Sequence, residues 1–179
     1  MPAKLIACLA TVDFMDRRKI EIERISVGSS RPFEAVVATL MAAIGHPDMS
    51  KLEKVIQSDA PFAELESTVR GSLGKTDLML FMRLDAGVVL RKESGRDTPK
   101  IMRFLIGNPL IMKEMAKHVV DATSYAPVTV LVYEQSDGVH LSYDTMANLL
   151  KPYANAAALA IARDLDTKIE SLLHEAAGS

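Results

Sequence analysis

The chain has 179 residues, of which 49% are hydrophobic and 25% charged, and its formal net charge is −2 at pH 7. These values predict a single globular domain over residues 1–179 with a well-buried core. So balanced a charge gives no electrostatic footprint for nucleic acid, and no stretch approaches the roughly 20 apolar residues of a membrane span.

The N-terminal residues contain the single cysteine, Cys8, directly after the apolar residues 5–7. This arrangement is similar to a lipoprotein cleavage box, but too little apolar sequence precedes the cysteine for a signal peptide. One cysteine cannot form an internal disulfide, so we expect a protein of the reducing cytoplasm. Residues 5–14 are expected to form a short strand or an ordered arm.

The first half of the chain predicts one strand followed by helices. Residues 19–27 alternate between apolar and charged side chains with one slip of phase, which indicates a strand with a bulge or a change of face. The glycine at 28 is expected to end it. Residues 33–44 carry one continuous apolar face of helical period. Weaker apolar stripes predict two further helices in the region 46–75.

The middle of the chain is expected to return to strands. Residues 78–84 predict a strand that bends at Asp85-Ala86-Gly87. Residues 88–91 are expected to continue it or to form a second strand. The polar residues 92–100 predict a turn or surface loop, and residues 101–106 predict the next strand.

A corner and a hairpin follow. Gly107-Asn108-Pro109 predicts a strand-to-helix corner, because asparagine is a strong helix cap and proline favours the first helical position. The helix after it is expected to reach residue 119. The Asp137-Gly138 pair between two alternating runs predicts a hairpin of residues 127–134 and 139–143.

In the expected hairpin, a two-residue turn would pair Val132 with Tyr143 and Tyr133 with Ser142. One face then holds only apolar residues and tyrosine: Val128, Val130, Val132, Val139, Leu141 and Tyr143. A long C-terminal helix is predicted over residues 152–177, with a narrow apolar stripe that packs on another layer.

This order of elements predicts the α+β class, with an antiparallel sheet and helices packed mainly on one face. The other face would carry Leu131, Tyr133 and apolar residues from 79–82 and 102–104. Because so apolar a face is unfavourable in water, we expect a homodimer that buries it.

Three segments together resemble the domain-of-unknown-function 302 family: residues 104–111, 125–134 and 137–144. The Gly-Asn-Pro corner and the Val-Tyr-Glu, Asp-Gly and Ser-Tyr-Asp sequences of the hairpin carry the resemblance. Weaker similarity at residues 31–34 and 80–90 extends it over most of the chain.

The resemblance implies a fold related to that of the TATA-box-binding protein, in the order strand, helix, four strands, helix. It implies no reaction, because the activity of the family is unknown, and a shared fold does not imply DNA binding. It also marks residues 46–58, within the helical insertion region 46–75, as an insertion relative to shorter members. Relatives are expected to carry an Asp-His pair where this chain has Asp85-Ala86. Chemistry that depends on that imidazole is therefore lost here or supplied by another group.

Five residues are candidates for a ligand-binding site: Asp85, Asn108, His118, Tyr133 and Tyr143. A carboxylate in an apolar strand, such as Asp85, is costly unless it bonds to a turn or belongs to a site. Asn108 and the free N–H groups behind it would hold a carboxylate or phosphate, or Asn108 only caps the corner.

His118 stands four residues after Glu114, a spacing at which a carboxylate holds a general base. The alternative is a solvated histidine that the negative end of a helix favours. Tyr133 and Tyr143 either line a pocket or pack with satisfied hydroxyls.

No metal site and no cofactor are predicted, because the four histidines lack ligand spacing and the cysteine lacks a partner. Two functions remain open. The first is a homodimeric module that binds a small apolar or anionic ligand between sheet and helices near Asn108. The alternative is an enzyme with acid–base chemistry, a hydrolase or isomerase, that uses Asp85 and His118.

Overall fold

The structure is a computed structural model and describes residue 15 and residues 17–179, so the expectations for Cys8 and residues 5–14 lie outside the described residues. An antiparallel sheet forms its centre, in the order β1-β5-β4-β3-β2. Its strands are β1 (Arg24–Ser29), β2 (Met79–Asp85), β3 (Ile101–Gly107), β4 (Val128–Gln135) and β5 (Gly138–Asp144).

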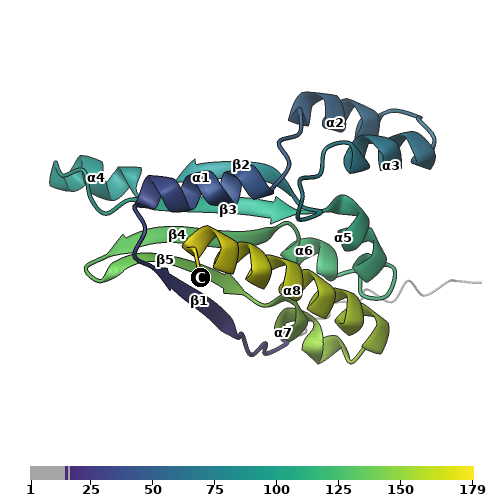
Figure 1. Cartoon of the computed structure of the whole chain (residues 1–179). Helices are drawn as coiled ribbons and strands as arrows, with labels where there is room; N and C mark the ends of the chain where they lie inside the picture. The colour runs from purple at the N-terminus through teal and green to yellow at the C-terminus, as the bar shows by residue number, and fades with distance from the viewer. Residues whose placement is uncertain (1–14, 16) are drawn as a thin grey trace, which may run out of the picture.

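Helices α1 and α8 lie side by side across one face of this sheet (Figure 1). The expected α+β class, with helices on one face of an antiparallel sheet, is therefore confirmed. The helices are α1 (Phe33–Ala43), α2 (Met49–Gln57), α3 (Phe62–Arg70), α4 (Val88–Ser94), α5 (Pro109–Ala116), α6 (Ala122–Tyr125), α7 (Met146–Leu150) and α8 (Ala156–Ala177). The finer likeness to the TATA-box-binding protein stays a prediction.

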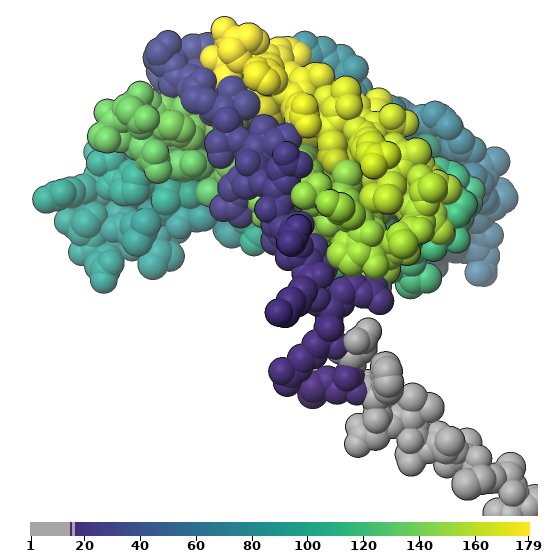
Figure 2. Space-filling view, turned by 90° about the horizontal axis from the view of Figure 1, so that it is seen from below, coloured from purple at the N-terminus to yellow at the C-terminus, as the bar shows by residue number. Residues whose placement is uncertain are grey.

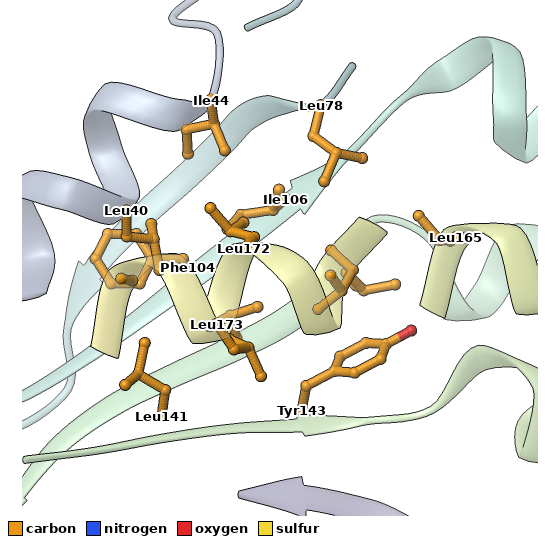
Figure 3. Packing of buried hydrophobic residues seen from close by; sticks show 14 of the residues in the cluster. Leu40, Ile44, Leu78, Phe104, Ile106, Leu141, Tyr143, Leu165, Leu172 and Leu173 are labelled. Carbon is orange, nitrogen blue, oxygen red and sulfur yellow. The ribbon is translucent and has the colours of Figure 1, made fainter. Parts of the chain in front are cut away.

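The core lies between the sheet and the two long helices. Leu40 of α1 and Leu172 of α8 lie against Phe104 of β3, and all three side chains are fully buried (Figure 3). Burial of each such side chain contributes about 1.5–3 kcal/mol. The predicted stripe of α8 is buried throughout, at Ala158, Ala162, Leu165, Ile169, Leu172 and Ala176.

The β4–β5 hairpin has the predicted inner face but not the predicted register. Tyr143 pairs with Val130 instead of Val132, because residues 136–137 form the turn and Gly138 belongs to the strand. Gly138 has a φ of +140°, and a Cβ there would lie 2.8 Å from a carbonyl oxygen of β1. Glycine is thus required in the strand. A shift of two residues leaves every side chain on its predicted face.

Strand β1 begins at Arg24, later than the predicted start at Lys19, and ends at Ser29. The reason lies in its partner. β1 pairs with β5, and Arg24 stands opposite Asp144, the last residue of β5. The slip of phase between residues 22 and 25 therefore marks the entry to the strand and not the predicted bulge.

Residues 88–94 form helix α4, so the predicted continuation of the strand at 88–91 is wrong. The predicted loop at 92–100 also begins inside this helix. A short apolar run is compatible with a strand and with a helix, and here the glycines on either side of it determine that it forms a helix. Gly87 lies so close to the loop that a Cβ would be 2.8 Å from the Pro99 carbonyl oxygen. Gly95 ends the helix with a φ of +67°.

Helix α8 begins at Ala156, four residues after the predicted start at Pro152. Residues 151–153 form a separate 3₁₀ turn, and Ala154 then takes a left-handed conformation with a φ of 50°. Asn155 caps the new helix, because its side chain accepts a 3.0 Å hydrogen bond from a main-chain N–H three residues on.

The predicted helical region 46–75 contains α2 and α3, which project past one end of the sheet (Figure 1). They bury Leu52 and Val69 together with Met79 of β2, in a cluster separate from the main core. The strand therefore anchors both helices.

A buried polar network joins α8 to the start of α7. The Tyr143 hydroxyl donates a 2.6 Å hydrogen bond to Asp166 of α8. The main-chain N–H groups of Met146 and Ala147 donate to the same carboxylate, at 2.7 and 3.0 Å. Burial and the neighbouring Asp166 charge raise the pKa of Tyr143. A carboxylate from α8 thus caps α7.

Replacing Tyr143 with phenylalanine removes one donor from this buried carboxylate. We expect Tyr143→Phe to lower the free energy of unfolding by about 1–3 kcal/mol, measured by urea denaturation. Tyr133→Phe is the matched control, because the Tyr133 hydroxyl makes no hydrogen bond among the described residues. If Tyr143→Phe lowers the free energy of unfolding no more than the control does, the network does not stabilise the fold as proposed.

Candidate functional site

A cleft of about 710 Å³ opens on the helix-covered side of the sheet, at the edge formed by β2. Its walls come from α1, β2, β3, α4 and the loop between α4 and β3. Helix α4 lies at the left end of Figure 1, beyond the end of β2, and the teal segment that contains it protrudes at the left of Figure 2. The cleft therefore lies near one end of the molecule, far from α5 and the corner that precedes it.

One wall of the cleft is apolar. Phe33, Val37 and Met41 come from successive turns of α1, so they share one side of that helix. Ile101 and Met102 of β3 form the opposite wall. Such a surface suits the apolar part of a small molecule.

An ion pair closes the α4 end of the cleft. Arg91 of α4 binds Asp85 at the end of β2, and it also donates a 3.3 Å hydrogen bond to the Pro99 carbonyl oxygen. The hydrogen bond from Arg91 holds the pKa of the Asp85 carboxyl below its usual value. The second oxygen of Asp85, Oδ1, is buried without a hydrogen-bond partner among the described residues.

A second charged group lies where the loop meets α1. Lys100 binds Glu34 of α1, and its main-chain N–H donates a 2.8 Å hydrogen bond to Glu134. The pKa of Lys100 is raised mainly by its hydrogen bond to Glu34, with smaller effects of Glu134 and Asp97. One lysine is thus surrounded by three carboxylates, and this end of the cleft is acidic.

Arg83 differs from the other cations of the cleft. It pairs in register with Phe104 of the core, so its side chain lies on the helix-covered side of the sheet. Its Nε contacts the Met102 sulfur at 3.4 Å. Within the described part of the chain, no carboxylate lies within ion-pair distance of Arg83.

Of the residues predicted for a site, Asp85 lines this cleft and the others do not. Asp85 pairs with Met102 at the start of β3, whereas His118 follows α5 beyond the other end of β3. The length of β3 between these ends is about 17 Å. His118 is exposed, and Glu114 binds Lys113 and Lys117 in its place. The structure therefore does not bring Asp85 and His118 together as an acid–base pair.

Asn108 is committed to the corner. Its side-chain oxygen accepts a 2.9 Å hydrogen bond from the N–H of Leu110, and its amide donates to the Asp77 carbonyl oxygen at 3.0 Å. A hollow of about 470 Å³ lies beside it, with Lys113 and Glu114 already paired on its wall. The cap explains Asn108 fully.

The two tyrosines lie on opposite faces of the sheet. Tyr143 is 2% exposed in the core. Tyr133 lies on the uncovered face and stacks on His140 with ring centroids 5.5 Å apart. The predicted partner of Tyr133, Ser142, instead pairs with Leu131.

The pattern of β2 contained a signal for Arg83. Arg83 and Asp85 are two positions apart in an apolar strand, with one residue between them, so both point to one face. The sequence does not show which helix faces them across the cleft, so the contribution of α1 to the cleft could not be predicted. Over the described residues, no cluster of potential metal ligands occurs, and no helix is long and apolar enough to span a membrane.

Comparisons with known proteins agree with the resemblance seen in the sequence. The family profile described as "Domain of unknown function DUF302" matches residues 53–176. The fold is similar to the crystal structure of an uncharacterized conserved DUF302 protein from Bacillus stearothermophilus, with a TM-score of 0.58 and 14% identity, covering 86% of this chain and 97% of that chain. At this identity the likeness concerns the fold alone. None of the curated proteins matches the chain.

The ion pair of Asp85 makes a prediction about pH. Because the folded-state pKa of Asp85 is lowered, its stabilising effect is present above the unfolded carboxyl pKa of about 4 and is lost as the pH falls through the folded value. Asp85→Asn should therefore lower the melting temperature at pH 7, and the difference from the wild type should shrink in acid. Asp97→Asn, in the same cleft without an ion pair among the described residues, is the control. A difference that stays constant with pH would contradict this role.

Proposed function

The chain belongs to the DUF302 family, whose function is unknown, and we propose a function for it from its structure. The protein is a homodimeric module that binds a small ligand in the cleft beside α1. The observation that carries the proposal is the cleft itself. Its volume of about 710 Å³ falls in the range of small-molecule sites, and it combines an apolar wall with a few charged groups.

The lining of the cleft favours binding over catalysis. Among the described residues, the cleft contains no histidine, cysteine, serine, threonine or tyrosine. Of the three carboxylates that line the cleft, those of Glu34 and Asp85 are held in ion pairs that lower their pKa, so they are poor proton acceptors. The third, Asp97, has no histidine in the cleft to act with it as an acid–base pair. Ala86 follows Asp85 directly, so no imidazole supplements them at that position.

The uncovered face of the sheet supports the homodimer. Met82 and Leu84 of β2 are 53% and 49% exposed on this face. Their neighbours on β3 and β4 include Leu105, Leu131 and Tyr133, which are only partly buried. Polar side chains such as Arg103 and Thr129 lie among them, so the apolar residues form a patch on a mixed face. A second copy of the chain would remove this apolar surface from water.

The ligand proposal is tested by blocking the cleft. Ala38 is an exposed residue of α1 that lines the cleft, so Ala38→Trp fills it without altering the core. Anilinonaphthalene sulfonate serves as a fluorescent probe with an apolar body. We expect Ala38→Trp to weaken probe binding by about tenfold or more, because the indole occupies the site.

Ala160→Trp on the exposed side of α8 is the matched control and should bind the probe as the wild type does. Circular dichroism melting of all three proteins establishes that they are equally folded. Unchanged probe binding by Ala38→Trp would overturn the proposed site.

The homodimer is tested by native mass spectrometry of the wild type, which should give twice the 19.5 kDa subunit mass. Leu131→Arg places an unpaired charge in the proposed interface, which costs several kcal/mol, so this variant should be monomeric. Val120→Arg, at a residue 76% exposed outside the sheet, should remain dimeric. A monomeric wild type, or a dimeric Leu131→Arg variant, would contradict the interface.

A further inference from the structure

We propose that the cleft selects an apolar monocarboxylate, whose carboxylate binds Arg83 and whose hydrocarbon part lies against α1; this inference rests on the cleft being a ligand site. The six charged residues of the cleft are Glu34, Arg83, Asp85, Arg91, Asp97 and Lys100. Two ion pairs account for four of them, Arg91 with Asp85 and Lys100 with Glu34. Arg83 is the cation left without a carboxylate partner among the described residues.

The position of Arg83 suits it to an anion. Its Nε lies on the Met102 sulfur at the floor of the cleft, and its two terminal nitrogens make no hydrogen bond among the described residues. A guanidinium offers parallel donors that match the two oxygens of a carboxylate. Met102 is buried, whereas Arg83 lies on the edge strand. The carboxylate of the ligand would therefore lie at the mouth of the cleft and its hydrocarbon part inside.

The opposite end of the cleft limits the charge of the ligand. Around Lys100 lie the carboxylates of Glu34, Glu134 and Asp97, so this end has more negative than positive groups. A second anionic group on the ligand would approach these carboxylates and be repelled. The arrangement therefore favours one negative charge, at the Arg83 end, and disfavours a dicarboxylate of the same length.

The size and shape of the apolar wall define the rest of the ligand. Phe33, Val37 and Met41 cover about two turns of α1, a length of roughly 12 Å. An extended chain of eight carbons spans a similar length. Octanoate is therefore a suitable probe. Octanol and octanedioate are its matched comparisons, because all three have eight carbons and they carry one, no and two carboxylates respectively.

The test measures the affinity of the wild-type protein for octanoate, octanol and octanedioate by isothermal titration calorimetry. We expect octanoate to bind about tenfold more tightly than octanol, because its carboxylate forms a charge-assisted hydrogen-bonded pair with Arg83 that octanol cannot form. Octanedioate should bind more weakly than octanoate. In Arg83→Gln, octanoate should fall to the affinity of octanol, and octanol should be unaffected. Arg163→Gln, on the exposed side of α8, should leave all three affinities unchanged.

The failure of this inference differs from the failure of the proposed function. If octanoate and octanol bind equally, and Ala38→Trp abolishes both, the cleft is a ligand site but Arg83 does not select a carboxylate. If none of the three compounds binds, both the chosen ligand class and the use of the cleft for such molecules are overturned. An equal loss of octanoate affinity in Arg83→Gln and Arg163→Gln would also overturn the role of Arg83.

Discussion

The packing of two helices on five strands determines the rest of this structure. Strands lie about 4.8 Å apart, and a helix with its side chains is about 10 Å wide, so two helices cover about four strands. Helix α8 packs on β1 and β5, and α1 packs on β4. The fifth strand, β2, lies at the edge beyond them. The inner side of its far end is therefore not sealed by a helix, and the cleft opens there.

Polar residues on the inner side of β2 follow from this incomplete cover. Arg83 and Asp85 would be too costly to bury beneath a helix without partners. At the edge, Asp85 reaches Arg91 of α4, and Arg83 remains accessible from the cleft. The cleft thus lies at the margin of the hydrophobic core and uses Phe33 and Met102 of that core as its walls.

The sequence predicted those features that depend on local pattern. The inner face of the hairpin, the corner at Asn108 and the buried stripe of α8 follow from periodicity and capping, and the structure has all three. The register of the hairpin and helix α4 were not predictable, because the contact of Gly138 with β1 and the approach of Gly87 to the loop are tertiary. The site was only partly predictable for the same reason. Asp85 was found from its strand, but α1, which forms another wall of the cleft, comes from a distant part of the chain.

The cleft is separate from the buried hydrogen-bond network of Tyr143 and Asp166, and this separation affects how the sequences of proteins with this fold can vary. The anchor of α7 and α8 at Tyr143 lies on β5, three strands away from β2. Residues at the mouth of the cleft, such as Ala38 and Arg83, are exposed and contribute little to the core. Substitutions there can change the shape or charge that a ligand meets while the free energy of folding stays nearly constant. If the cleft binds a ligand as proposed, chains with this fold can therefore diverge in ligand preference before they diverge in architecture.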